Sequence, residues 1–149
     1  MDGFSVSILI AAFSMWLGLN HPEFKGVTPP PVEVKFHSYT ELCYLYFGEN
    51  CNPGIGPVAE ALYLNDTIYL PDVCNYNKDI YCQSLILHEL VHHFQIYSEI
   101  DYAAKCPTNS KAPRELEAYM IQKKWLEEQG VNPWLYIDGM AVSSAGSCK

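Results

Sequence analysis

The six cysteines of this chain constrain its fold more than any other feature, because they are spread along a short sequence. They stand at positions 43, 51, 74, 82, 106 and 148 of 149 residues. An even number of cysteines in a small chain is typical of disulfides formed in an oxidising compartment. None of them forms a CxxC pair, which argues against a cysteine-based metal site. We therefore expect a secreted or otherwise extracytoplasmic protein, with buried free thiols as the alternative.

The spacing of the cysteines suggests how they pair. The segments "CYLYFGENC" and "CNYNKDIYC" share the pattern C-x7-C, which favours one local bridge in each and leaves the last two cysteines for a third. Six cysteines also allow many other connectivities, which stay open here. The predicted bridges are Cys43–Cys51, Cys74–Cys82 and Cys106–Cys148.

Length and charge predict one folded domain that does not bind nucleic acid. The chain suits a single compact domain over residues 1–149. Hydrophobic residues make up 49% of it, unlike disordered chains. The formal net charge is −8, with only nine Lys and Arg, so a basic surface that could neutralise phosphates is lacking. The acidic balance by itself identifies no substrate.

The uncharged segment "FSVSILIAAFSMWLGL", residues 4–19, leaves two interpretations open. It is short for a membrane span, which needs roughly 20 residues, so we expect no stable span. It is long enough for a signal-like segment, but no positive charge precedes it and no clear A-x-A site follows. We favour an N-terminal helix within residues 1–20 that covers the core with Trp16 and Leu17.

The middle of the chain mixes strand and helix patterns, which predicts an α+β fold. Val32, Val34 and Phe36 alternate with charged residues and indicate a half-buried strand. Within residues 59–71, "ALYL" and "TIYL" flank a polar "ND", which predicts a β-hairpin. The remaining segments are residues 38–48 (helical or mixed), 48–57 (a turn-rich loop) and 131–149 (an irregular tail).

Two consecutive helices follow the hairpin. The first is predicted from Ile80 to about Tyr97, with Asp79 as its N-cap. The second has Pro113 in its first turn and runs to Gln129, before Gly130. Four side chains of the first helix form an apolar stripe that can face the core: Leu87, Leu90, Val91 and Phe94.

One edge of that stripe carries the motif with the clearest chemistry, in "HELVHHFQ". His88 and His92 are four residues apart, so on a helix both imidazoles can reach one Zn²⁺ at about 2.0 to 2.1 Å. Glu89 lies about 100° further round, beside the metal, where it can take a proton from water and return it to a leaving amine. A random chain of this composition contains H-E-x-x-H about once in a hundred, so coincidence on an ordinary helix is the alternative.

A catalytic zinc site needs a third protein ligand and one open position. The segment "PRELEAYMIQKKWLEEQG" supplies Glu115 and Glu117 on the second helix. Here the sequence resembles the zincin metallopeptidases, more narrowly the gluzincins, in which HExxH is followed by a helix bearing a glutamate ligand. "RELEAY" is similar to the R-E-(F/Y)-x-A-D segment of the CAAX-prenyl-protease-like gluzincins. That resemblance implies Glu115 as the third ligand and places Glu117 at a variable position.

The resemblance covers roughly residues 59–129 and implies a minimal zincin-like domain. Its small antiparallel sheet or hairpin would pack on the active-site helix and the second, ligand-bearing helix, with the N-terminal helix added. The chain departs from the family at Tyr119, where the resemblance implies an aspartate that orients a ligand histidine. A tyrosine hydroxyl can supply such a hydrogen bond, but without a charge.

Other polar residues near the motif receive lesser roles. His93 is predicted to lie on the Glu89 side of the helix, either as a partly exposed residue or as a neighbour of Glu89, and outside the metal site. Gln95 is predicted to be a structural hydrogen-bonding residue, and no role is assigned to His21 or His37. Three tyrosines near the motif are candidate hydrogen-bond donors to a developing oxyanion: Tyr97, Tyr102 and Tyr119.

Two main hypotheses of function follow. The first is a zinc metallopeptidase that acts on a peptide or protein substrate, with Zn²⁺ held by His88, His92 and Glu115 and with Glu89 as general base and acid. The alternative is a non-catalytic, disulfide-stabilised binding module on a zincin-like scaffold. Hydrolysis of a non-peptide amide is a third possibility, because the motif specifies metal and water but not the bond that is cleaved.

Overall fold

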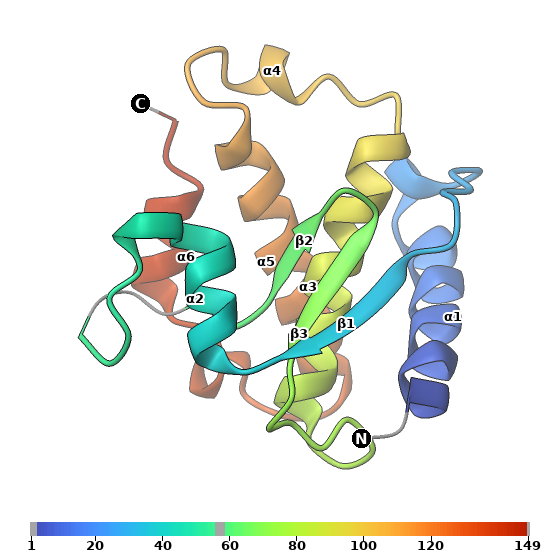
Figure 1. Ribbon diagram of the computed structural model, residues 1–149. Coiled ribbons are helices and arrows are strands. Elements are labelled where there is room, and N and C mark those ends of the chain that lie inside the picture. The colour runs from blue at the N-terminus through green and yellow to red at the C-terminus, as the bar shows by residue number, and fades with distance from the viewer. Residues whose placement is uncertain (1–2, 56–58, 149) are drawn as a thin grey trace.

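The computed structural model describes residues 3–55 and 59–148, and within these residues helices surround a small sheet (Figure 1). The helices are α1 (Gly3–Asn20), α2 (Tyr39–Phe47), α3 (Ile80–Tyr97), α4 (Tyr102–Lys105), α5 (Lys111–Glu128) and α6 (Gly139–Ala145). The strands are β1 (Glu33–His37), β2 (Leu62–Leu64) and β3 (Thr67–Pro71). Short 3-10 helices are η1 (Pro22–Phe24), η2 (Gly48–Asn50) and η3 (Pro133–Leu135). The predicted α+β class is confirmed.

The predicted hairpin forms, but the sheet is mixed rather than antiparallel. β2 and β3 pair antiparallel around Asn65 and Asp66, which have positive φ angles of 50° and 60°, as a two-residue type I′ turn requires. β1 pairs with β3 in parallel, with Glu33 opposite Thr67, so the strand order is β1-β3-β2. The predicted antiparallel hairpin is present, whereas the parallel pairing of β1 was not predicted, because alternation of side chains reveals which face of a strand is buried, but not the direction of the strand.

Helix α3 lies at the centre of the molecule and begins and ends where it was predicted. The Asp79 side chain accepts a hydrogen bond from the Cys82 backbone N–H and caps the first turn. The sheet covers one side of α3, while α5 and α1 lie on either side of it in Figure 1. All four side chains of the predicted apolar stripe are buried, and Ile68 and Leu70 of β3 join the same core.

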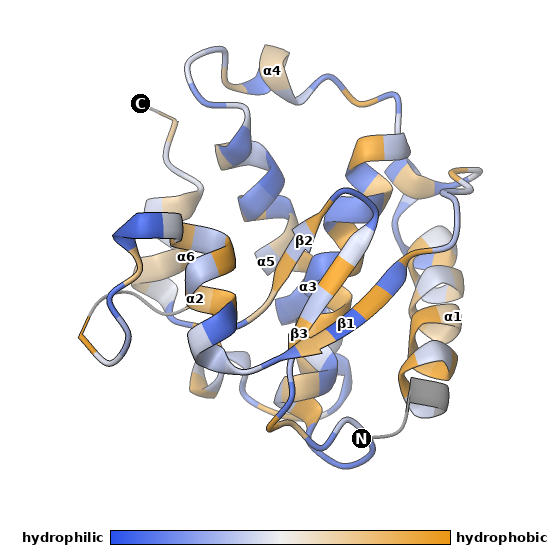
Figure 2. Ribbon diagram, viewed as in Figure 1, coloured by the Kyte–Doolittle hydropathy of each residue, from blue (hydrophilic) through white to orange (hydrophobic). Residues whose placement is uncertain are grey.

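Helix α1 is part of the core, as the favoured interpretation of the N-terminal segment predicts. Phe13 and Leu17 are buried, and Phe13 packs edge-on against Trp125 of α5 with the ring centroids 5.2 Å apart. The Trp16 indole donates a hydrogen bond to Glu128. Figure 2 shows α1 as mostly neutral to hydrophobic, in contrast to the largely hydrophilic α5. Among the described residues, no helix has both the length and the apolar character needed to cross a bilayer.

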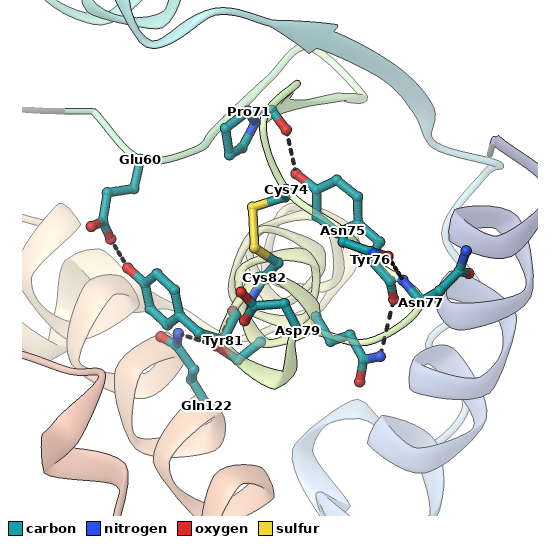
Figure 3. Close-up of a disulfide and its surroundings, with 12 residues drawn as sticks. Glu60, Pro71, Cys74, Asn75, Tyr76, Asn77, Asp79, Tyr81, Cys82 and Gln122 are labelled. Atoms are coloured by element: carbon teal, nitrogen blue, oxygen red, sulfur yellow. Dashed lines mark hydrogen bonds between the residues drawn. A yellow bond between two sulfur atoms is a disulfide. The ribbon is translucent and has the colours of Figure 1, made fainter. Parts of the chain in front are cut away.

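The three predicted disulfides are all present, and no cysteine is free. The bridge in Figure 3, Cys74–Cys82, joins the loop after β3 to the first turn of α3. In the same loop the Tyr76 hydroxyl donates to the Pro71 carbonyl over 2.8 Å. This loop therefore fixes the end of β3 to the start of the helix that carries the motif.

The predictions for other segments need small corrections. Residues 38–48 form α2, whose N-cap Ser38 makes a capping box with Glu41. The expected loop at 48–57 begins with η2, and its last two residues lie outside the described residues. Helix α5 begins two residues before Pro113. The tail, predicted to be irregular, contains α6, which Asp138 caps. A seven-residue helix is too short to show a clear hydrophobic period.

Candidate metal centre

His88 and His92 lie one turn apart on α3 and present their imidazoles to the same side. Their ring centroids are 5.1 Å apart and the ring planes are inclined at 74°. His88 is buried, and His92 is mostly buried. The two imidazoles therefore lie on one face of α3, as their i, i+4 spacing predicts.

Glu115 of α5 reaches both imidazoles. One carboxylate oxygen lies 3.3 Å from Nε2 of His88, and the other lies 3.0 Å from Nε2 of His92. The candidate ligand atoms of these three residues all lie within 4.8 Å of one another. Within the described part of the chain, they are the group of His, Cys, Asp or Glu side chains close enough together to hold a metal ion. Of the two glutamates considered from the sequence, the structure therefore brings Glu115 to the histidines.

The carboxylate of Glu117, the other candidate, has different hydrogen-bond partners. Its carboxylate accepts hydrogen bonds from the Tyr102 hydroxyl at 2.5 Å and from Nε2 of Gln95 at 3.0 Å. Gln95 in turn contacts His92. Glu117 therefore binds Gln95, which contacts the candidate ligand His92, and does not itself lie beside the two histidines.

Both imidazoles are held through Nδ1 by a glutamine amide oxygen. Nδ1 of His88 lies 3.0 Å from Oε1 of Gln122, and Nδ1 of His92 lies 2.9 Å from Oε1 of Gln95. An amide oxygen only accepts, so in each pair the proton belongs to Nδ1. In the neutral imidazole this leaves a lone pair on Nε2, directed at Glu115, which is the state in which histidine binds a metal.

The orientation of the Gln122 amide follows from its other partner. The Ser84 hydroxyl donates to the Tyr81 carbonyl at 2.6 Å, so its oxygen is left to accept from Nε2 of Gln122 at 2.9 Å. The amide nitrogen therefore faces Ser84 and the amide oxygen faces His88. A chain of three hydrogen bonds, each with a defined direction, ends on His88, the first candidate ligand.

The Gln95 amide is oriented in the same manner. Its Nε2 donates to the Arg114 carbonyl at 2.9 Å and to Glu117, and both of these groups only accept. The amide oxygen is therefore the atom that meets His92. The prediction that Gln95 is a structural hydrogen-bonding residue is confirmed.

The charges of the site depend on each other. Burial raises the pKa of Glu115, but hydrogen bonds from His88 and His92 outweigh it and hold that pKa well below its usual range. Burial lowers the pKa of His92, but the hydrogen bond to Glu115 and the charge of Glu89 raise it to about 9. In the absence of a metal, a positive charge on His92 therefore balances Glu115. A divalent cation can take over that role.

The donor set fits zinc. Two imidazole nitrogens and one carboxylate are the ligands of one common class of catalytic zinc site, with a fourth position left for water or substrate. The ligand atoms are 3.0 to 3.3 Å apart across Glu115 and the histidines, close to the separation that bonds of about 2.0 to 2.1 Å produce around a tetrahedral ion. Both Nε2 atoms also face Glu115, as joint binding of one ion by the three residues requires.

Glu89 lies beside this group and does not take part in it. Its side chain is buried, and desolvation raises the pKa of its carboxyl, although the nearby imidazoles and a hydrogen bond with the Tyr63 backbone act in the opposite direction. A carboxyl group with a raised pKa is a stronger base than an ordinary carboxylate, as a proton acceptor requires. The position therefore agrees with the side of α3 predicted for Glu89.

Tyr119 lies against the site without making the hydrogen bond considered for it. Its ring meets the His88 ring edge-on with the centroids 4.5 Å apart, while Nδ1 of His88 is bound by Gln122. Burial and the charges of Glu115 and Glu89 raise the pKa of Tyr119 to about 12, so its hydroxyl keeps its proton. Gln122 occupies the orienting role that the family resemblance implies for an aspartate at position 119.

The other two candidate tyrosines have partners elsewhere. The Tyr102 hydroxyl is used by Glu117, and the Tyr97 hydroxyl donates to Asp66 at 2.7 Å. Of the three tyrosines proposed as oxyanion donors, only Tyr119 contacts a ligand histidine among the described residues.

Sequence reasoning missed Gln122 and Ser84, although helical spacing could have found both. Gln122 follows Glu115 by seven residues, two turns along the same face of α5. Ser84 precedes His88 by four residues on α3. Neither residue is charged, and uncharged residues are easily passed over when metal ligands are sought.

Toward its N-terminal end, α3 carries a polar contact on the same face as the histidines. Tyr81 precedes His88 by seven residues, its hydroxyl donates to Glu60, and its ring stacks on Tyr136 with centroids 5.8 Å apart. Figure 3 shows Tyr81 between Glu60 and Gln122. This face of α3 is therefore polar along most of its length.

Comparison with known proteins assigns a family but no activity. No significant match was found among curated proteins or among solved structures. The model of one family, described as a domain of unknown function (DUF6647), matches residues 5–149. Since this match extends over nearly the whole chain, the chain belongs to the DUF6647 family.

Proposed function

We propose that this protein is a zinc-dependent hydrolase of peptide bonds. The observation that carries the proposal is the orientation of His88 and His92. Both are bound at Nδ1 by an amide oxygen, and both direct Nε2 at the carboxylate of Glu115. Without a cation, two neutral imidazoles would direct their lone pairs at an anion. The arrangement therefore favours a positive charge among the three residues.

Each residue has a role in the proposed reaction. His88, His92 and Glu115 would hold the ion, which supplies Lewis acidity to a carbonyl group and to water. Glu89 accepts a proton from the attacking water and delivers it to the leaving amine, so that peptide and water become a carboxylic acid and an amine. The Tyr119 ring contacts the His88 ring, and its hydroxyl is our candidate donor to the developing oxyanion.

We place the protein outside the cytoplasm and infer a peptide or protein substrate. Three disulfides join all six cysteines, and such bridges persist in oxidising compartments. We therefore propose secretion as the route. The net charge of −8 disfavours nucleic acid as a substrate.

Replacement of the proposed base tests the mechanism. Glu89→Gln keeps the size of the side chain but cannot accept a proton, so we expect turnover of a peptide library to fall by about 10² to 10⁴-fold while zinc content stays at one ion per chain. Glu99→Gln, in the loop after α3, is the matched control and should behave as wild type. Peptide cleavage followed by mass spectrometry, together with metal analysis, measures both properties. Undiminished cleavage by the Glu89 variant would exclude this mechanism.

A binding module is the second candidate, and a specific observation favours it. His88 is oriented by the neutral Gln122 rather than by a carboxylate, and the three disulfides stabilise the fold independently of a metal. On this alternative the protein presents its surface to a partner and hydrolyses nothing. Thermal unfolding that does not respond to a chelator, combined with no cleavage of the library, would support it over the hydrolase.

A further inference from the structure

His93, next to the ligand His92, is buried and belongs to a separate hydrogen-bond network. Of the two alternatives expected for His93, partial exposure is wrong, since only 1% of its surface is accessible. Its Nε2 donates to the Pro30 carbonyl at 2.7 Å, and its Nδ1 lies 2.8 Å from the Tyr63 hydroxyl. The side chain thus connects α3 to the segment before β1 and to strand β2.

The same network holds the tip of the hairpin. The Tyr63 hydroxyl lies 3.2 Å from Asp66 in the turn, and the Asp66 carboxylate also accepts from the Tyr97 hydroxyl at 2.7 and 2.9 Å. His93 and Tyr97 are one turn apart on α3 and their rings are in contact. The hairpin is therefore fixed to α3 at two successive turns.

The backbone N–H and C=O groups of Tyr63 point away from β3, toward the outer edge of the sheet. β2 is an edge strand, and the pair Leu64–Thr67 flanks the two-residue turn. Such a turn closes on a hydrogen-bonded pair, so the next pair, Tyr63 with Ile68, is the non-hydrogen-bonded one. The N–H and C=O of Tyr63 are therefore not used within the hairpin.

Tyr63 consequently meets α3 with both its side chain and its backbone. Its hydroxyl binds His93, and its backbone, as a hydrogen-bond partner, lowers the pKa of the Glu89 carboxyl group. Glu89 and His93 are four residues apart, on one face of α3. A displacement of β2 from His93 would also displace the backbone group beside Glu89.

We propose that His93 is a positioning residue for Glu89: by binding the Tyr63 hydroxyl, it holds the edge strand β2 so that the Tyr63 backbone orients the carboxyl group. This inference rests on the proposed function for the catalytic role of Glu89. The contact between strand and helix is independent of that function.

Removal of one hydroxyl tests the proposal with little risk to folding. Tyr63→Phe keeps the ring but breaks the contacts with His93 and Asp66. We expect kcat to fall about ten-fold, with KM and zinc affinity unchanged, and backbone amides of residues 62–64 to exchange faster with solvent. Tyr69→Phe is the matched control, because Tyr69 lies on β3 beside His37 and should match wild type. Peptide kinetics, zinc titration and hydrogen exchange by mass spectrometry provide the readouts.

A second variant and the exchange data separate the outcomes. His93→Gln, if it folds, should reproduce the effect of Tyr63→Phe, and the double variant should be no slower than either single one. Unchanged exchange at residues 62–64 in Tyr63→Phe would overturn the proposal. Faster exchange combined with an unchanged kcat would also overturn it. A variant that loses zinc affinity but keeps its kcat would overturn it as well. If wild type cleaves no peptide, the proposed function fails separately, and the exchange data still decide whether His93 holds β2.

Discussion

The Nδ1 atom of His88 lies 3.0 Å from Oε1 of Gln122, and this hydrogen bond connects α3 to α5 at the candidate metal centre. The contact is buried, and the Gln122 amide is itself oriented by Ser84. A ligand histidine oriented in this way loses less rotational freedom when it binds a metal. The relation between the two residues therefore bears directly on metal affinity.

Replacement of Gln122 should weaken metal binding. In Gln122→Leu, Nδ1 of His88 loses its acceptor, so we expect zinc affinity to fall about 10 to 100-fold. Gln83→Leu is the control, since Gln83 lies on α3, the helix of His88, but donates to the Tyr76 carbonyl, away from the histidines. Competition with a chromophoric chelator measures the affinity. Wild-type affinity in the Gln122 variant would contradict the role assigned to this hydrogen bond.

The two glutamates of "RELEAY" should separate metal binding from stability. Glu115→Gln removes the carboxylate between the histidines and should abolish stoichiometric zinc binding. Glu117→Gln should keep the zinc but lower the free energy of unfolding by about 1 to 3 kcal/mol, because hydrogen bonds from Tyr102 and Gln95 to a charged acceptor are weakened. Metal analysis and denaturant unfolding of both variants check this. Loss of zinc in Glu117→Gln alone would reverse the assignment.

The metal-free protein should lose stability as the pH rises. Because Glu115 raises the pKa of His92 to about 9 from a usual value of 6.5, the charged imidazole stabilises the fold fully below pH 6.5, and this contribution is lost as the pH passes through about 9. We expect the Tm of chelator-treated protein to fall over this range, and that of His92→Gln to fall less.

Zinc competes with the same proton, so zinc affinity should rise over the range in which the metal-free fold weakens. Thermal unfolding with and without zinc across a pH series tests both trends, and parallel curves for wild type and His92→Gln would contradict the first.

The long-range disulfide should contribute more to stability than a local one. Cys106–Cys148 spans 42 residues and Cys43–Cys51 spans 8, so loop closure predicts losses of about 4 and about 2.5 kcal/mol when each pair is replaced by serine. Chemical denaturation of the two double variants measures the difference. A larger loss for the short loop would show that local packing, rather than chain entropy, dominates at these bridges.

The sequence predicted best those features that depend on neighbouring residues. Helix α3 agrees from Ile80 to Tyr97 because Asp79 caps it and its apolar stripe has the helical period. The two local disulfides follow from their equal spacing. His88, His92 and Glu115 come together because α3 and α5, which are separated in the chain only by the short segment with α4, pack side by side, and the motif specifies which of their faces meet.

Features that depend on distant contacts were missed. The parallel direction of β1 is set by how the chain returns through α2, which no alternation of side chains records. His93 resembles an exposed residue in sequence, and only contacts with Pro30 and Tyr63, 63 and 30 residues away, explain its burial. Gln122 was passed over because its importance comes from the geometry of α5 against α3, not from its charge.

The placement of the ligands on two helices has a mechanical consequence. A metal held by His92 and Glu115 would form a reversible cross-link between α3 and α5, the two helices on either side of the segment that contains α4. That segment also contains Cys106, whose disulfide joins it to Cys148. One connection responds to chelators and acid and the other to reducing agents. The connection between α3 and α5 can therefore be opened by one treatment while the other tether stays intact, so the two forms of cross-linking can be studied separately in the same molecule.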